Sequence, residues 1–177
     1  IGVGKTLTDH RFIWNFCTEP EKELNQRNIL WPRGKILGGS SSINGMLYVK
    51  GAPHRYDMWR DGNNPGWGYK ELLPYFRKLE DRPESHHPDR GVGGPIKISS
   101  GSCRDKLSDA FYQACVDVGA QPNEDYNLNF DGVGYLQYST KNGLRCSTSS
   151  TYLKISKKNR NLKIITNAEV EKIIFEG

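Results

Sequence analysis

The sequence predicts a mixed α/β fold, and three observations support this prediction. Segments with a helical pattern alternate along the chain with short apolar runs that are typical of strands. The chain has 177 residues, of which 36% are hydrophobic and 25% are charged, as in a globular protein with a sizeable core. The 19 glycines and 9 prolines indicate many turns between the elements.

The first half of the chain is expected to contain one short strand and three helices. The strand is predicted at residues 12–16, where aromatic and β-branched side chains gather. The helices are predicted at residues 40–48, 54–61 and 69–81. A hydroxyl residue would cap the first helix. The third is the best supported, because its apolar side chains recur on one helical face. They are Leu72, Leu73, Phe76 and Leu79.

The second half of the chain alternates between strands and helices after a Pro- and Gly-rich loop at residues 82–95. Strands are predicted at residues 96–98, 133–140, 162–166 and 169–175, and helices at residues 105–118 and 147–157. Gly119 would end the first of these helices, and Asn142-Gly143 predicts a tight turn. This order is that of a mixed α/β or α+β layout.

The composition argues against several classes of function. The net charge is +5, and the basic residues are scattered rather than clustered, which argues against a nucleic-acid partner. No apolar run reaches the ~18 residues of a membrane span. The four cysteines, Cys17, Cys103, Cys115 and Cys146, form no Cys-x-x-Cys pattern. We therefore expect free thiols and no metal site, with one disulfide left open for a secreted protein.

The most informative stretch covers residues 33–46, with the sequence RGKILGGSSSINGM. An apolar run meets two glycines, then three serines, then a segment able to start a helix. Glycine lets a backbone approach a ligand closely, and a helix start offers unpaired N–H groups at a positive dipole end. The stretch therefore predicts a cradle for an anion such as a pyrophosphate. The alternative is a tight strand-to-helix turn that binds nothing.

Residues 34–46 resemble the first signature of the glucose–methanol–choline (GMC) oxidoreductases, a family of FAD enzymes. The flanking Trp31-Pro32-Arg33, Trp67-Gly68-Tyr69 and Leu73-Pro74-Tyr75-Phe76 resemble the insect glucose-dehydrogenase-like branch. The likeness covers essentially the whole chain but only part of a typical member. Because the chain begins at Ile1 and ends just after a strand-like segment, we expect it to be an internal part of a longer protein.

The resemblance implies that eight residues bind FAD, namely Gly38, Gly39, Ser40, Asn44, Gly45, Met46, Leu47 and Val170. The two glycines at 38 and 39 and Ser40 would hold the pyrophosphate through backbone N–H groups. Residues 44–47 would lie against the flavin ring system, and Val170 would meet the adenine through its backbone. The Asn side chain can both donate and accept hydrogen bonds. The plainer alternatives are a local-turn role for Asn44 and an ordinary core position for Val170. Some members bind flavin covalently through a His, and Ile43 at that position implies non-covalent FAD.

The resemblance also implies a domain organisation. Residues 1–80 would form part of an FAD-binding domain with its covering loop, residues 81–155 part of the substrate domain, and residues 156–177 strands that return to the FAD-binding domain. The implied activity is oxidation of the CH–OH group of an alcohol or sugar, with electrons passing to a quinone or to oxygen.

Two parts of the family's machinery are not in this sequence. They are the C-terminal His that acts as catalytic base and the Gly-x-Gly-x-x-Gly of the nucleotide-binding βαβ unit. We therefore expect no catalytic residue in this chain, no turnover by the chain alone, and too weak a hold on FAD to keep it through purification. Two alternatives stay open: a catalytically silent GMC-like binding or structural module, and a P-loop nucleotide hydrolase suggested by Gly4-Lys5-Thr6.

Overall fold

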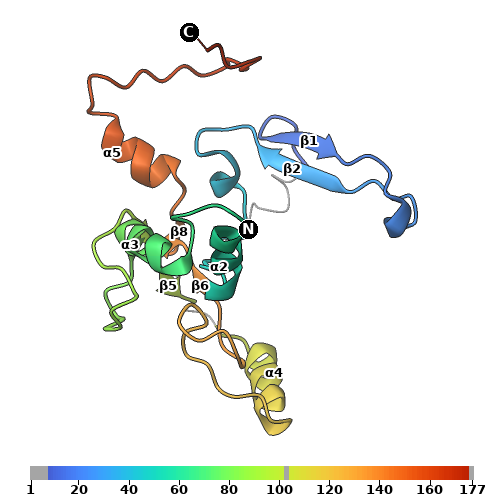
Figure 1. Cartoon of the computed structure of the whole chain (residues 1–177), viewed down its shortest axis with the longest axis vertical. Coiled ribbons are helices and arrows are strands. Elements are labelled where there is room, and N and C mark those ends of the chain that lie inside the picture. Colours follow the sequence, from blue (N-terminus) through green and yellow to red (C-terminus); the bar gives the residue numbers. More distant parts are fainter. Residues whose placement is uncertain (1–7, 102–103, 176–177) are drawn as a thin grey trace.

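The computed structural model describes residues 8–101 and 104–175, and its helices and strands alternate along the chain (Figure 1). The helices are α2 (Pro53–Asp61), α3 (Tyr69–Leu79), α4 (Lys106–Asp117) and α5 (Lys154–Ser156), and the shorter turns are the 3-10 turns η1 (Lys22–Leu24) and η2 (Gly39–Ser42) and the π turn η3 (Ser149–Leu153). The strands are β1 (Ile13–Cys17), β2 (Leu30–Gly34), β3 (Glu80–Asp81), β4 (Ile96–Lys97), β5 (Ser99–Ser100), β6 (Gln137–Tyr138), β7 (Thr140–Lys141) and β8 (Leu144–Arg145). The Gly4-Lys5-Thr6 match and Cys103 lie outside the described residues.

The described strands form four two-stranded sheets. The longest is the antiparallel β1–β2 ribbon, in which Ile13 faces Gly34 and Cys17 faces Leu30. β3 pairs with β4 in parallel, whereas the β5–β6 and β7–β8 pairs are antiparallel. An isolated bridge to Tyr138 ties Leu47, which follows η2, to β6. The glycine-serine stretch is therefore held by a segment some 90 residues further along the chain.

Local signals place two elements where they were predicted. Asp105 caps α4 by accepting a hydrogen bond from Ser108 N at 2.9 Å. Gly119, with φ +100°, takes the left-handed conformation that ends the helix. Asn142 and Gly143 have φ values of 51° and 73°, which suit the tight hairpin between β7 and β8. These predictions and the mixed α/β class are confirmed.

The centre of the molecule is polar. In the described part of the chain only Ile13, Ile43 and Ile98 are buried hydrophobic residues. The buried polar residues are Lys50, Glu80, Asp81, Arg82, Arg90, Asn123, Asn127, Gln137, Ser147 and Thr151. Because buried charges are tolerated only when they are paired and hydrogen-bonded, these side chains must form a network.

Glu80 is the hub of that network. It accepts from Arg90 Nε and, at 3.0 Å, from the Tyr48 hydroxyl, and its Oε2 lies 3.2 Å from Lys50 Nζ. Arg90 Nη1 also reaches both carboxylate oxygens of Asp125, at 2.7 and 2.6 Å. Burial raises the pKa of Tyr48 and lowers that of Lys50. Two cations and two carboxylates therefore balance, and they join the end of α3 to loops on either side of it.

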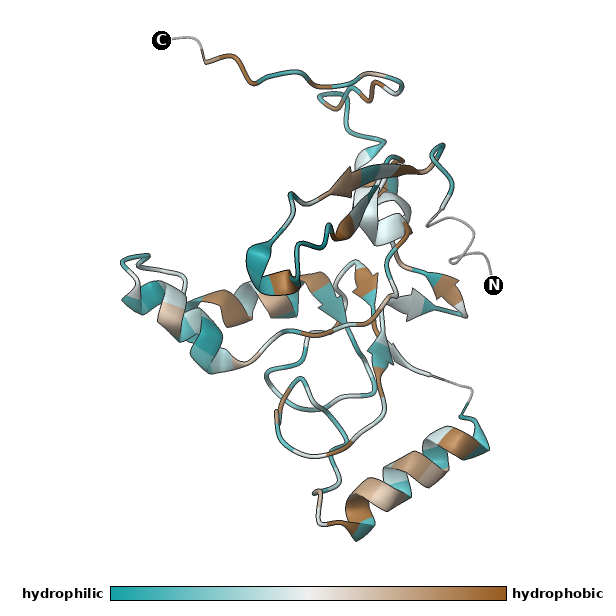
Figure 2. Cartoon of the chain, turned by 90° about the vertical axis from the view of Figure 1, so that its right-hand side faces the viewer, coloured by the Kyte–Doolittle hydropathy of each residue, from teal (hydrophilic) through white to brown (hydrophobic). Residues whose placement is uncertain are grey.

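The chain is extended rather than closed around one core. Its accessible surface is 13777 Å² for a mass of 20.1 kDa, whereas a compact monomer of this mass exposes about 8,700 Å². The β1–β2 ribbon, α4 and the segment after α5 project away from the middle of the molecule in Figure 1. Figure 2 shows hydrophobic residues along each of these projections, and Phe111 of α4 and Phe175 in the segment after α5 are exposed. No helix in the described ranges is long and apolar enough to cross a membrane.

Several predicted elements are shorter than expected. Residues 40–48 form only the single turn η2, because serine hydroxyls bond back to the backbone and Met46 has a positive φ of 63°. The third helix ends at Leu79, where the chain turns into β3 to pair with β4. The strand predicted at residues 133–140 is limited to β6 and the start of β7. Residues 147–157 form η3 and α5, so the predicted helix begins with a π turn.

The two strands predicted at residues 162–166 and 169–175 are wrong. Residues 161–175 take no regular secondary structure and are exposed. A strand is stabilised by hydrogen bonds and side-chain contacts to a neighbouring strand, and no described segment pairs with this one. One strand that the sequence did not predict, β2, contains Pro32 at its centre. A proline is tolerated there because each strand of a two-stranded ribbon is an edge strand.

Candidate functional site

The glycine-serine turn, which comprises residues 34–42, begins where β2 ends. Gly38 and Gly39 have φ values of +92° and +54°, a region that favours glycine. A Cβ on Gly34 would overlap the Gly39 carbonyl, so the chain doubles back closely on itself at this point. A Cβ on Gly39 would have no atom within 4 Å, which leaves its outer side open to an approaching molecule. The Gly39 N–H itself donates to Ile36 O at 2.8 Å.

The serine hydroxyls hold the turn together from within. Ser40 Oγ accepts from Gly34 N at 3.1 Å, and Ser42 Oγ donates to Leu37 O at 3.0 Å. Ser41 Oγ donates to Gly38 O at 2.5 Å and accepts from Thr148 N at 3.0 Å. The hydroxyls therefore shape the turn and tie it to the start of η3. A ligand at this turn would have to be bound by backbone groups.

The segment after the turn presents hydrogen-bond donors without acceptors. Within residues 8–101 and 104–175, no acceptor is found for the N–H groups of Gly45 and Leu47 or for Asn44 Nδ2. A Cβ on Gly45 would meet nothing within 4 Å. Asn44, Gly45 and Leu47 are exposed, whereas Ile43 is buried. Unpaired donors beside an exposed apolar side chain suit a flat ligand that carries acceptor atoms on its edge.

The donors of Asn44, Gly45 and Leu47 form a strip that is held in place by segments distant in the sequence. Met46 O accepts from Ser139 N at 2.8 Å, and Tyr48 N donates to Gln137 O at 2.9 Å. Arg145 Nη1 donates to Asn44 Oδ1 at 2.6 Å and to Ser41 O at 3.1 Å. Burial lowers the pKa of Arg145, although a guanidinium stays charged at neutral pH.

A cavity of about 650 Å³ lies beside the approach to the turn. The cavity is lined by three segments. They are represented by Arg11 and Trp14, by residues 34–37 and by residues 165–169. Val170 follows directly after this lining, and its side chain is exposed. The structure thus brings the neighbourhood of Val170 to residues 34–37, next to the glycines. The other seven predicted residues all lie within residues 38–47, in the turn and in the segment that follows it.

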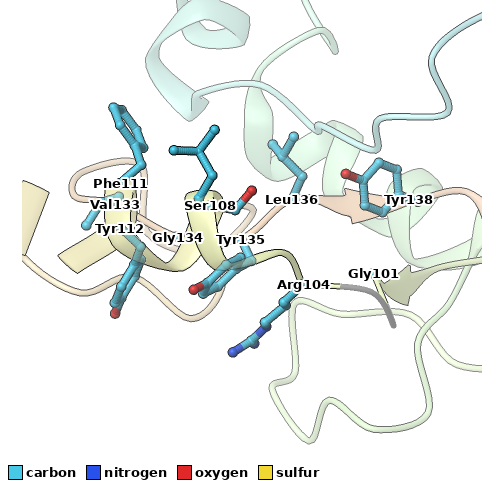
Figure 3. Close-up of a pocket in the computed structure, with 11 residues that line it drawn as sticks. Gly101, Arg104, Ser108, Phe111, Tyr112, Val133, Gly134, Tyr135, Leu136 and Tyr138 are labelled. Carbon is cyan, nitrogen blue, oxygen red and sulfur yellow. The ribbon is translucent and has the colours of Figure 1, made fainter. Parts of the chain in front are cut away.

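A second cavity, of about 570 Å³, lies between α4 and the segment that leads into β6 (Figure 3). Arg104 lies over the Tyr135 ring with its guanidinium carbon 3.9 Å from the ring centroid, and Tyr112 stacks on Tyr135 at 5.1 Å. The Tyr135 hydroxyl donates to Asp109 at 2.5 Å. Arg104 and the Tyr135 hydroxyl are therefore already engaged within the chain, and the glycine-serine turn is the better candidate site.

No metal centre accompanies either cavity among the described residues, where no group of three His, Cys, Asp or Glu side chains is placed to hold an ion. Cys17, Cys115 and Cys146 are free thiols. None of the four histidines forms a hydrogen bond with residues 38–47 in the described structure.

The chain belongs to the GMC oxidoreductase family, since the family model described as GMC oxidoreductase matches residues 3–177. Relatives include the oxygen-dependent choline dehydrogenases of Brucella anthropi, 40% identical over 167 residues, and of Vibrio vulnificus, 38% identical over 173 residues. These matches cover 94% and 96% of this chain but 30% and 31% of the relatives. The chain thus spans less than a third of their length.

Solved structures of this family have the same fold. The match with pyridoxine 4-oxidase from Mesorbium loti covers 99% of this chain and 35% of that protein's chain, with a TM-score of 0.91 and 29% identity. An FAD-dependent oxidoreductase from Chaetomium thermophilum matches 94% of this chain and 31% of its own, with a TM-score of 0.83 and 27% identity. These likenesses confirm the predicted GMC FAD-binding fold and support FAD as the cofactor of the family.

Sequence reasoning missed Arg145 and Thr148. Both contact the glycine-serine turn from more than 100 residues away, and Thr148 Oγ1 donates to Gly38 O at 3.2 Å. Nothing in their own neighbourhood marks them, because an Arg and a Thr after a hairpin are ordinary surface residues by composition. The pairing of Leu47 with β6 in the folded chain helps to bring the two segments together.

Proposed function

We propose that this chain is the part of a GMC oxidoreductase that holds FAD non-covalently, and that the intact protein oxidises the CH–OH group of a small alcohol. The strip of unpaired donors at Asn44, Gly45 and Leu47 carries the proposal, because it lies at the end of the stretch that resembles the family's first signature and a Cβ on Gly45 would meet no atom within 4 Å. When bound, FAD supplies the hydride acceptor of the reaction. The buried Ile43 offers no nucleophile for a covalent link.

Each part of the cofactor has a proposed position. The flavin ring lies against Asn44, Gly45, Met46 and Leu47. The pyrophosphate lies at Gly38, Gly39 and Ser40, where the open side of Gly39 allows close approach. The adenine lies near the backbone of Val170, by the 650 Å³ cavity. Residues 1–80 and 156–177 then belong to the FAD-binding domain, and residues 81–155 belong to the substrate domain.

The names of the relatives favour a choline-type alcohol as the substrate and oxygen as the electron acceptor. A sugar substrate, as in the glucose-dehydrogenase-like branch, is the second candidate. The motifs that contain Trp31 and Trp67 favour it, whereas the Brucella anthropi and Vibrio vulnificus relatives are both choline dehydrogenases. A quinone is the alternative acceptor.

An NMR titration of the purified chain with FAD tests the proposal. We expect the chain to purify without yellow colour and to show no choline oxidation, because the resemblance implies a catalytic His that lies outside these residues. Added FAD should shift the amide signals of Gly45, Met46 and Leu47 first. Shifts confined to the α4 cavity, or no shift at millimolar FAD, would contradict the proposed site. ADP-ribose, which lacks the flavin ring, should leave the Gly45 and Leu47 signals in place while moving those of Gly38 and Ser40.

A further inference from the structure

The orientation of the Asn44 side chain is determined by its two neighbours. Asn44 Oδ1 lies 3.1 Å from Met46 N and 2.6 Å from Arg145 Nη1. A backbone N–H and a guanidinium can only donate, so the side-chain atom that they share must be the amide oxygen. The Asn44 nitrogen is therefore turned to the other side, where no acceptor lies among the described residues.

Arg145 reaches Asn44 from the end of the β7–β8 hairpin. The same nitrogen, Nη1, donates to Ser41 O at 3.1 Å, so one guanidinium bridges the glycine-serine turn and the residue that follows it. A hydrogen bond donated by a guanidinium is charge-assisted and therefore stronger than one between neutral groups. Asn142 and Gly143 close the hairpin and thereby determine where Arg145 lies.

We propose that Arg145 is a positioning residue that holds Asn44 as a hydrogen-bond donor, so that the ligand atom opposite Asn44 is an acceptor. This inference rests on the proposed function and narrows it: the matching flavin atom is a carbonyl oxygen or an unprotonated ring nitrogen, and a protonated nitrogen is rejected. The N–H groups of Gly45 and Leu47 present the same polarity, so three neighbouring donors select an acceptor-rich edge. Under this proposal Asn44 only donates toward the flavin, because Arg145 and Met46 occupy its oxygen.

The Arg145–Asn44 contact is tested first without any ligand. In the unliganded chain, NMR should show slow exchange with water for the Arg145 Nη protons and fast exchange for the Asn44 side-chain NH₂. Slow exchange of the Asn44 NH₂ together with fast exchange at Arg145 would overturn the proposed orientation. This measurement does not depend on FAD, so the contact is judged even if the proposed function fails.

The donor role is tested with FAD and three variants. Asn44→Asp keeps an oxygen for Arg145 but replaces the free donor by an acceptor, and it should weaken FAD binding about tenfold or more while leaving ADP-ribose binding unchanged. Arg145→Met should weaken FAD binding similarly, and Arg145→Lys, which retains a charged donor, should restore part of it. The control Arg27→Met should change nothing, because the one hydrogen bond of the Arg27 side chain to the described residues goes to Leu24 O in the η1 loop.

The outcomes separate the two levels of inference. Wild-type affinity for FAD in Asn44→Asp would overturn the donor role, and so would an equal loss of ADP-ribose binding, which would show a general structural defect. Absence of FAD binding by the wild-type chain at millimolar concentration would overturn both the donor role and the proposed function. Normal FAD binding by the wild type with loss confined to Asn44→Asp and Arg145→Met would support both.

Discussion

Lys50 Nζ lies 3.2 Å from Glu80 Oε2, and neither side chain exposes any surface to solvent. The pair joins the segment after the candidate site to the end of α3, and Arg90 and Asp125 complete the charge balance. Lys50 also donates from its backbone to Asn127 Oδ1 at 2.7 Å. A polar network of this kind replaces the apolar core that the described residues lack, and the position of residues 44–50 depends on it.

Removing the Glu80 charge should destabilise the chain strongly. Glu80→Gln leaves Lys50 and Arg90 buried with one anion in place of two, and breaking a buried ion pair from one side costs about 3 kcal/mol. Denaturant unfolding followed by tyrosine and tryptophan fluorescence measures this loss. The matched control is Glu84→Gln, because Glu84 is half-exposed and lies 3.8 Å from Arg82, and its loss should cost less than about 0.5 kcal/mol. Equal stability of the two variants would show that the network is not stabilising.

Two glycine substitutions should separate folding from ligand binding. Gly34→Ala places a Cβ against the Gly39 carbonyl, so the turn must open and unfolding should occur at lower denaturant concentration. Gly45→Ala meets no atom within 4 Å and should fold normally. Its methyl group would project toward the proposed flavin position, so FAD binding in the NMR titration should weaken. A Gly45→Ala variant that binds FAD as the wild type does would place the flavin elsewhere.

The N-terminus of α4 should respond to acid. The hydrogen bond from Ser108 N lowers the pKa of Asp105 below its ordinary value of 3.8. The ionised cap therefore stabilises the folded helix above pH 3.8, and this contribution is lost as the pH falls through the lower, folded pKa. Amide-exchange protection in α4 should decline over that range. In Asp105→Asn, which caps without titrating, the acid-dependent part of the decline should be absent. If the wild type and Asp105→Asn lost protection in α4 over the same pH range, Asp105 would not be the source of the acid-dependent decline.

Thr148 should anchor the glycine-serine turn through its hydroxyl. Thr148→Val retains the shape and the backbone bond to Ser41 but removes the hydrogen bond to Gly38 O. A net hydrogen bond contributes about 1 kcal/mol, so hydrogen exchange at Ser41 should become several times faster. Thr148→Ser keeps the hydroxyl and should behave like the wild type. If Thr148→Val exchanged as slowly as the wild type while Thr148→Ser exchanged faster, the methyl group and not the hydroxyl would be the anchor.

Elements whose signals are local could be predicted from the sequence. The cap at Asp105 and the stop at Gly119 delimit α4, and Asn142-Gly143 forms its own turn, because each depends on residues within one helical or hairpin turn. The glycine-serine turn was predicted for the same reason, since positive φ values such as those found at Gly38 and Gly39 favour glycine.

Elements that need a distant partner could not be predicted in the same way. The apolar run that ends at Phe175 has strand propensity, yet it stays irregular because no described segment pairs with it. β2 forms despite Pro32 because β1 lies beside it. β3 takes the last residues of a helical pattern because β4 competes for them.

The sequence by itself determined the family signature, the open glycine backbone and the non-covalent character proposed for the cofactor, because these follow from residue identities within one short stretch. Only the tertiary structure decided that the centre would be a charge network and that Arg145 would take the oxygen of Asn44. The physical reason is that hydrogen-bond polarity depends on which group comes within 3 Å of another, and residues 101 positions apart meet only after the chain has folded.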